Sequence, residues 1–296
     1  MRWSVSNRIV HHLLYKYLYF LFDKTFIYDS YSCRLDKGTH RAVKRLEQYT
    51  RIVSKNYTQD CWALKLDIKQ FFASVDHEIL LKFIRRKVND KNILWLINEI
   101  LTSFRTDKGK NAGIPLGNLT SQIFANIYLN ELDQFVKQDL KIKYYIRYAD
   151  DFIILNTGKL QLKPSLISVG NFLQNDLKLQ IHPKKIILRK LIQGVDFCGY
   201  IILPHYRLPR TKTKKRIFEK LEQKICAPNF KQSLQSYLGY LSHANSYRLS
   251  QELNNQSAFF TTVIPNHSLP VKSHYPFSIR SSIFIPCIEK FSLQVV

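Results

Sequence analysis

Two adjacent carboxylates inside an apolar segment constrain this chain more than any other feature. Residues 144–155 are apolar on both sides of Asp150 and Asp151, the pattern of a β-hairpin whose turn carries two acids. Two carboxylates about 4 Å apart repel by roughly 4 kcal/mol at an effective dielectric of about 20. Such a turn therefore needs a proton or a cation, unless it is only a polar turn at the surface.

A third acid lies on a predicted strand. In residues 61–72 the apolar side chains alternate, so Lys65 and Asp67 point away from the apolar face. Phosphoryl transfer gives a reason for three such acids, because two divalent metal ions held by carboxylates clamp the attacking and the leaving oxygen. Taken alone, Asp67 is also compatible with a surface strand residue.

The charge balance indicates a polyanionic partner. The chain has 45 Lys and Arg against 22 Asp and Glu, a net charge of +23, and self-repulsion of that size destabilises a compact state. Residues 184–224 are strongly basic, with twelve Lys and Arg against three acids, and aromatic side chains lie among them. This composition is typical of a surface that follows a nucleic-acid backbone; a solvated face is the alternative.

The composition also excludes several classes of protein. Apolar residues make up 45% and aromatic residues 13%, which is enough for a core and excludes whole-chain disorder. The five cysteines are odd in number and show no metal-ligand spacing, against a disulfide scaffold or a zinc module. The early apolar stretch, residues 13–22, is too short to span a bilayer. We therefore expect a cytoplasmic protein with no membrane partner.

Hydrophobic periodicity predicts helices mixed with strands. Helices are expected up to Phe26, at residues 42–49, behind an Asp76 N-cap, at 93–101, behind a Thr120 or Ser121 N-cap, and at 171–179 and 231–241. Strands are expected at 61–72, in a hairpin at 144–155, and at 186–188 and 197–203. After about Asn254 the chain is rich in serine and proline, which predicts a poorly structured tail.

A loop before the predicted helix at residue 120 is a second candidate site. Residues 113–118 read Gly-Ile-Pro-Leu-Gly-Asn, and a backbone of this kind can approach a ligand closely at a helix N-terminus. An ordinary turn that leads into a helix is the alternative interpretation.

The order of these features resembles the reverse transcriptases. A strand with Asp67, the glycine loop, a Tyr148-Ala149-Asp150-Asp151 box, a lysine-bearing segment and Phe-Cys-Gly-Tyr at 197–200 follow in that family's order, over about residues 28–250. The resemblance implies an α+β right-hand polymerase with fingers, a palm whose antiparallel sheet carries the YADD hairpin, and a small helical thumb. The implied divisions are an N-terminal helix and fingers at 1–60, the palm with interleaved fingers at 61–205, the thumb at 206–250 and the tail at 251–296.

The resemblance also implies roles for individual residues. Asp67, Asp150 and Asp151 would hold two Mg²⁺ ions with help from the Ile68 carbonyl, and Lys185 would lie near the departing pyrophosphate. Phe72 would be the steric gate that rejects a ribose 2′-hydroxyl, and it would bind the nucleotide together with Ile68, Pro115, Leu116, Gly117 and Gln122. The primer grip and the thumb would bind primer and template through Phe197, Gly199, Tyr200, Lys212, Lys214, Lys215 and Arg216. The implied partners are template RNA, a DNA primer or cDNA, and dNTPs.

One departure from the common family pattern indicates a subgroup. Group II intron and retroviral enzymes usually have Pro-Gln-Gly in the nucleotide-binding loop, whereas this chain has Leu116 at the middle position. Residues 116–122 resemble the reverse transcriptases of diversity-generating retroelements, which copy a template RNA with frequent errors opposite adenine. This implies a prokaryotic or phage-borne enzyme with a basic accessory protein as a further candidate partner. A group II intron-like or phage-defence reverse transcriptase, and a non-catalytic RNA-binding relic, are the alternatives.

Overall fold

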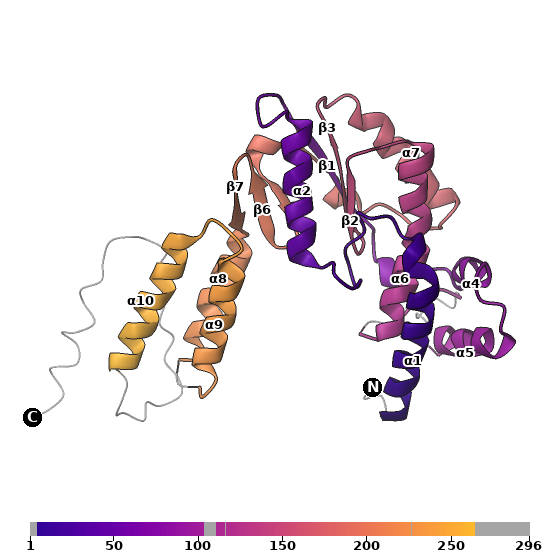
Figure 1. The fold of residues 1–296 in the computed structure, drawn as a ribbon, viewed down its shortest axis with the longest axis horizontal. Helices are drawn as coiled ribbons and strands as arrows, with labels where there is room; N and C mark the ends of the chain where they lie inside the picture. The colour runs from indigo at the N-terminus through magenta and orange to yellow at the C-terminus, as the bar shows by residue number, and fades with distance from the viewer. Residues whose placement is uncertain (1–4, 104–110, 116, 226, 264–296) are drawn as a thin grey trace, which may run out of the picture. The chain divides into compact units, whose positions relative to one another are not determined.

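An antiparallel sheet carries the acid pair. Among the described residues (5–103, 111–115, 117–225 and 227–263), the computed structural model places four strands in the order β2-β3-β1-β4 (Figure 1). β1 (Trp62–Asp67) lies between β3 (Asp151–Asn156) and β4 (Ile187–Lys190), and β2 (Tyr145–Tyr148) pairs with the other edge of β3. The expected combination of helices with an antiparallel sheet is confirmed.

Alternating side chains give this sheet two apolar faces. Leu64 and Phe152 are buried in a cluster with residues of α1 (Val5–Phe22), α6 (Leu119–Gln134) and α7 (Leu162–Asn175). Ala63 and Ile153 are buried in a second cluster with residues of α2 (Thr39–Val53). Side chains two apart on a strand share a face, so Asp67, four residues after Ala63, lies on the face of the sheet that α2 covers.

A second sheet follows β4. β5 (Val195–Phe197), β6 (Tyr200–Leu203) and β7 (Tyr206–Pro209) form an antiparallel sheet. The predicted single strand at 197–203 is wrong, because the chain reverses within it at Cys198 (φ 48°) and Gly199 (φ 90°). Apolar residues flank this turn on both sides and conceal it in the sequence.

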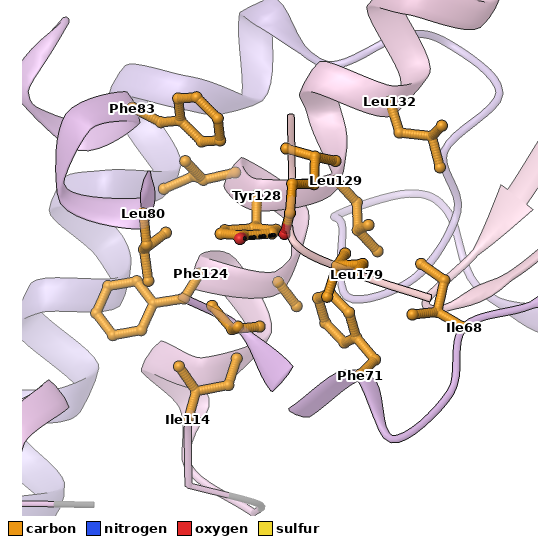
Figure 2. Close-up of a cluster of buried hydrophobic side chains, with 14 of the residues drawn as sticks. Ile68, Phe71, Leu80, Phe83, Ile114, Phe124, Tyr128, Leu129, Leu132 and Leu179 are labelled. Carbon is orange, nitrogen blue, oxygen red and sulfur yellow. Dashed lines mark hydrogen bonds between the residues drawn. The ribbon is translucent and has the colours of Figure 1, made fainter. Parts of the chain in front are cut away.

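A buried cluster around Tyr128 supports the end of β1 (Figure 2). The Tyr128 ring is fully buried, and its hydroxyl donates to a backbone carbonyl oxygen at 2.7 Å. Ile68, which follows Asp67 in the chain, belongs to the same cluster, as does Ile114 from the loop before α6. The core therefore fixes the backbone next to two of the predicted site segments.

The helix boundaries test the predicted caps. The Asp76 side chain accepts a hydrogen bond from the backbone N–H of Ile79, which confirms Asp76 as the N-cap of α4 (His77–Arg85). The Thr120 or Ser121 cap is wrong, since Asn118 precedes the first residue of α6 and Thr120 bonds the His11 ring instead. The remaining early elements are α3 (Phe71–Ser74), α5 (Lys91–Thr102) and the single turns η1 (Asp23–Thr25), η2 (Phe135–Asp139), η3 (Pro183–Lys185) and η4 (Leu191–Gln193).

The helix predicted at 171–179 begins earlier than expected. α7 starts at Leu162 and ends at Asn175. Pro164 lies in its first turn, where a missing backbone N–H removes no intrahelical hydrogen bond. A proline therefore lies at the start of this helix, although in the sequence a proline indicates a helix break as readily as a helix start.

Three helices end the described chain. α8 (Thr211–Glu222) and α9 (Phe230–Leu241) share a hydrophobic cluster with the first residues of α10 (Tyr247–Val263). The chain divides into a unit of residues 1–253 and a second unit that begins at Asn254. The poorly structured tail predicted for 251–296 is wrong for 251–263, which continue α10; residues 264–296 lie outside the described residues. Within the described parts of the chain, every helix is too short or too polar to cross a membrane.

Candidate active site

The structure brings the three predicted acids together at one end of the central sheet. Asp67, the last residue of β1, lies directly opposite Asp151, the first residue of β3. Asp150 occupies the turn between β2 and β3, and its carbonyl oxygen accepts a hydrogen bond from the Ile68 N–H at 3.3 Å. Cross-strand partners have Cβ atoms about 5 Å apart, so two strands hold three carboxylates against their mutual repulsion.

Lys65 holds one of these carboxylates by one oxygen. Its ammonium lies 2.9 Å from Asp151 Oδ2 and also donates to the Asp196 carbonyl oxygen at 2.9 Å. Asp151 Oδ1 is buried and has no hydrogen-bond partner in the structure. A buried carboxylate oxygen without a partner is costly, so this atom is suited to a cation that approaches from the acid site.

Burial and mutual repulsion act on the same two acids. Burial raises the pKa of Asp151 to about 6, opposed by the Lys65 ammonium and reinforced by the charges of Asp67 and Asp150. The pKa of Asp150 is also raised, first by burial and then by Asp67. Both shifts mean that these carboxylates by themselves disfavour their full negative charge and that a bound cation would favour it.

Lys185 lies against the third acid. Its Nζ donates to both oxygens of Asp67 at 2.9 Å, and this hydrogen bond raises the pKa of Lys185. Lys185 is the last residue of η3, and the residue before this turn is bonded to β1: the His182 N–H donates to the Asp67 carbonyl oxygen at 2.8 Å. The ammonium is half-exposed, so a surface side chain is placed on the acid site.

The donor set fits Mg²⁺ by chemistry. Carboxylate and carbonyl oxygens are the ligands that Mg²⁺ prefers, and Asp67, Asp150 and Asp151 supply them. Among the described residues, we find no group of three or more His, Cys, Asp or Glu side chains that is already arranged to hold a metal ion. Ion pairs with Lys65 and Lys185 occupy oxygens of two of the acids instead.

The glycine loop lies next to the segment that follows β1. The Ile114 N–H donates to the Phe72 carbonyl oxygen at 2.7 Å, and the Gly113 N–H donates to the Val75 carbonyl oxygen at 2.8 Å. Pro115 is buried and Gly117 is exposed with φ 90°. Leu116 lies outside the described residues, and Gln122 is half-buried in the first turn of α6. The structure therefore brings the loop to Phe72, five positions after Asp67 in the chain.

The turn between β5 and β6 is tied to both the acid site and the last helices. On the side of the acid site, the Lys65 ammonium donates to the Asp196 carbonyl oxygen of β5. On the side of the last helices, the N–H of Arg210, which precedes α8, donates to the Gly199 carbonyl oxygen at 3.1 Å. The same carbonyl accepts from the Tyr240 hydroxyl at 2.7 Å. Tyr200 stacks on Tyr240 with ring centroids 4.9 Å apart, and Phe197 is fully buried.

The basic residues predicted to bind template and primer share one short helix. Lys212, Lys214, Lys215 and Arg216 are all exposed in the first half of α8. Ile217 and Leu221 are buried on the opposite side, against α9. α8 is therefore amphipathic, with a cationic face in contact with solvent.

Comparison with known sequences places this arrangement in a family. Residues 2–202 match the family described as "Reverse transcriptase (RNA-dependent DNA polymerase)". The chain belongs to the reverse transcriptase family. The matched range contains the acid site, the glycine loop and the turn between β5 and β6, and it ends before α8.

Curated relatives of this chain are longer proteins. The COX1/OXI3 intron 2 protein of Saccharomyces cerevisiae is 24% identical over 72% of this chain and 32% of that protein. Protein YkfC of Escherichia coli is 24% identical over 68% of this chain and 61% of that protein. The group II intron-encoded protein LtrA of Lactococcus lactis is 25% identical over 63% of this chain and 40% of that protein. The chain thus spans between a third and about three fifths of these relatives.

Solved structures of telomerase share the fold. Apo telomerase from Candida tropicalis superposes with a TM-score of 0.53 at 15% identity, over 88% of this chain and 50% of that one. Telomerase from Candida albicans, in complex with a fragment of telomeric RNA, gives 0.52 at 12% identity, over 87% and 48%. At these identities the likeness shows the fold alone.

The roles of two residues at this candidate site were not predicted from the sequence. Lys65 has the same strand parity as Asp67, and that parity was a usable signal for a role beside the acids. Arg147 is the one charged residue in the strand before the acid pair, and it is fully buried. A charge inside an apolar strand indicates a buried partner, but the sequence does not say which one.

The raised pKa of Asp151 predicts a stability change. Because the folded-state pKa of about 6 exceeds the ordinary value of 3.8, folding at pH 7 is opposed by the ionised carboxylate, and this cost declines as the pH falls from about 6 to 3.8. We expect Asp151→Asn in metal-free buffer at pH 7 to stabilise the chain by about 1–3 kcal/mol. Thermal unfolding from pH 7 to pH 4 should show the difference shrinking towards zero. A variant that melts lower than wild type at pH 7 would contradict this.

Proposed function

We propose that this chain synthesises DNA on an RNA template by nucleotidyl transfer assisted by two Mg²⁺ ions. The observation that carries the proposal is the register of Asp67 opposite Asp151, with Asp150 in the adjoining turn, in a chain of the reverse transcriptase family. The runner-up, a non-catalytic RNA-binding relic, is less favoured because all three carboxylates are present and adjacent.

The acids and the lysines would divide the work. Asp67, Asp150 and Asp151, with the Ile68 carbonyl, would hold the metal ions, and bound ions would lower the pKa of the primer 3′-hydroxyl and offset the charge of the leaving pyrophosphate. Lys185 carries an exposed cation on a long flexible stem, so it can leave Asp67 and pair with phosphate oxygens. Lys65 keeps Asp151 Oδ2 occupied and leaves Oδ1 for the cation.

Other groups would select and align the substrates. The Phe72 side chain, on the segment bonded to the glycine loop, would exclude a ribose 2′-hydroxyl by size. Pro115, Gly117 and Gln122 would border the incoming dNTP. The turn that contains Gly199 and Tyr200 would support the primer end, and the cationic face of α8 would bind phosphates of the template and primer.

A primer-extension assay tests this function. The purified chain is given a DNA primer annealed to RNA, four dNTPs and MgCl₂. The proposal predicts extension that EDTA abolishes and that NTPs do not support. RNA binding without extension, on RNA and DNA templates and with either Mg²⁺ or Mn²⁺, would favour the relic instead.

For the subgroup, we propose the error-prone reverse transcriptase of a diversity-generating retroelement. Support comes from Leu116 and the residues after it, since an aliphatic side chain cannot give the hydrogen bonds that a Gln amide offers the nucleotide. The names of the relatives, which include a group II intron-encoded protein, support a group II intron-like enzyme as the second candidate. A template repeat in the flanking DNA that differs at adenines would favour the first.

Leu116→Gln tests the subgroup directly. A polar partner for the nucleotide rejects misplaced substrates better than an apolar contact does, so we expect fewer errors opposite template adenine. A gain of about 1 kcal/mol corresponds to a roughly fivefold drop in misincorporation. The measurement is sequencing of cDNA copied from an adenine-rich RNA by both variants. A wild type that is already accurate at adenine would exclude the retroelement assignment and leave the general function intact.

A further inference from the structure

Arg147 is a buried charge next to the turn that carries Asp150. Its side chain and that of Asp133 on α6 are both 0% exposed. Nε donates to Asp133 Oδ1 at 2.7 Å and Nη2 donates to Oδ2 at 2.6 Å, a two-pronged ion pair. A buried ion pair contributes little net stability compared with apolar residues of the same volume. Stability alone therefore does not explain the pair.

The rest of the guanidinium reaches the turn itself. Arg147 Nη1 donates to the carbonyl oxygen of Ala149 at 3.0 Å, and Nη2 donates to the Ser30 hydroxyl at 3.0 Å. Ala149 has φ 54°, a left-handed conformation that is uncommon for residues other than glycine. Its carbonyl belongs to the peptide bond that leads into Asp150, so the guanidinium bonds the strained peptide from which that acid projects.

The backbone of Arg147 is anchored as well. Its N–H donates to the Asp29 carbonyl oxygen at 2.9 Å, and its own carbonyl accepts from the Tyr31 N–H at 3.0 Å. With Asp133 on α6 and Ser30 in the segment before α2, the side chain joins three separate parts of the chain at one point. Hydrogen bonds thus fix both the backbone and the guanidinium of Arg147 independently of the contact with the turn.

We propose that Arg147 is a positioning residue, which holds the peptide between Ala149 and Asp150 so that the Asp150 carboxylate stands beside Asp67. The inference rests on the proposed function, since it names what keeps the metal-binding acids in place. Groups that orient metal ligands typically contribute 10–100-fold in metal affinity or activity. Lysine cannot replace Arg147, because one ammonium cannot bond Asp133 with two prongs and reach Ala149 as well.

The test compares two substitutions in the same buried cluster. Arg147→Lys should raise the Mg²⁺ concentration for half-maximal primer extension at least tenfold and weaken Mn²⁺ binding, measured by calorimetry without substrates. Tyr145→Phe is the matched control, because the Tyr145 hydroxyl donates to Asp133 Oδ1 at 2.7 Å and belongs to the same buried cluster. It should lower the melting temperature by a few degrees, roughly, and leave the Mg²⁺ midpoint unchanged. Equal midpoint shifts in both variants would overturn the proposal.

A third variant covers the case in which Arg147→Lys does not fold. Arg147→Met with Asp133→Leu and Tyr145→Phe removes every charge of the cluster at similar volume, a kind of change that preserves stability in other proteins. The proposal predicts a folded chain with weakened Mn²⁺ binding. Mn²⁺ binding at wild-type strength would overturn it. If the wild-type chain binds Mn²⁺ and makes no DNA, the proposed function fails, and the calorimetry still decides the role of Arg147.

Discussion

Asp150→Asn should reduce metal-dependent DNA synthesis by several orders of magnitude while RNA binding stays close to wild type. The substitution removes one negative charge and hardly changes the shape of the side chain. Asp150 lies in the turn beside the Asp67–Asp151 pair, so its loss would remove one of the three negative charges that attract the divalent ions. The measurement is single-turnover primer extension on an RNA template, together with an RNA-binding titration.

Asp139→Asn is the matched control for this loss. Asp139 is an exposed acid at the end of η2 and lies outside the acid site. Its substitution changes the net charge by the same amount, so synthesis should remain at the wild-type rate. Near-normal extension by Asp150→Asn would remove Asp150 from the active site, whereas an equal loss in both variants would indicate a general effect of charge.

Replacement of the cationic face of α8 should weaken nucleic-acid binding and flatten its dependence on salt. Lys212, Lys214, Lys215 and Arg216 are exposed together, and each phosphate contact contributes about 0.7–0.9 to the slope of log K against log salt. With all four changed to Gln, the slope should fall by roughly 3. Because Ile217 and Leu221 keep the opposite side of α8 buried, the helix should still fold.

An equal change of charge elsewhere is the control for α8. Lys82, Lys91, Lys141 and Lys163 are exposed outside α8, and their replacement by Gln removes the same number of positive charges. The proposal predicts a much smaller change of slope for this set. The same slope in the α8 variant as in wild type would mean that α8 is only a solvated face.

The parts of the fold that follow local rules could be predicted from the sequence. In β1 the large apolar side chains alternate, and Asp76 precedes a clear apolar stripe, so a strand lies within the expected range and the N-cap is found where expected. The strand is shorter than the predicted 61–72, because it ends at Asp67 and Phe71–Ser74 form α3. The turn at Cys198 and Gly199 could not be predicted, because apolar residues on both sides conceal the reversal. The early start of α7 was hidden by Pro164, which favours a helix start as much as a helix break.

At the candidate site, too, the residues with a local sequence signal could be predicted, and those that depend on distant contacts could not. The three acids were found because their residue types and spacing are unusual in apolar strands. The roles proposed for Lys65 and Arg147 depend on partners far away in the chain, such as Asp196 and Asp133. No local pattern encodes which buried acceptor a cation will meet, so tertiary packing decides these contacts.

Anomalous scattering from Mn²⁺ tests the central claim most directly. Crystals of the chain with Mn²⁺, a DNA primer on an RNA template and a non-hydrolysable dNTP analogue would locate the ions without reference to activity. The account predicts Mn²⁺ peaks at the carboxylates of Asp67, Asp150 and Asp151, with Lys185 displaced from Asp67 towards the phosphates. Mn²⁺ absent from these carboxylates, with Lys185 still paired to Asp67 in the complex, would contradict it.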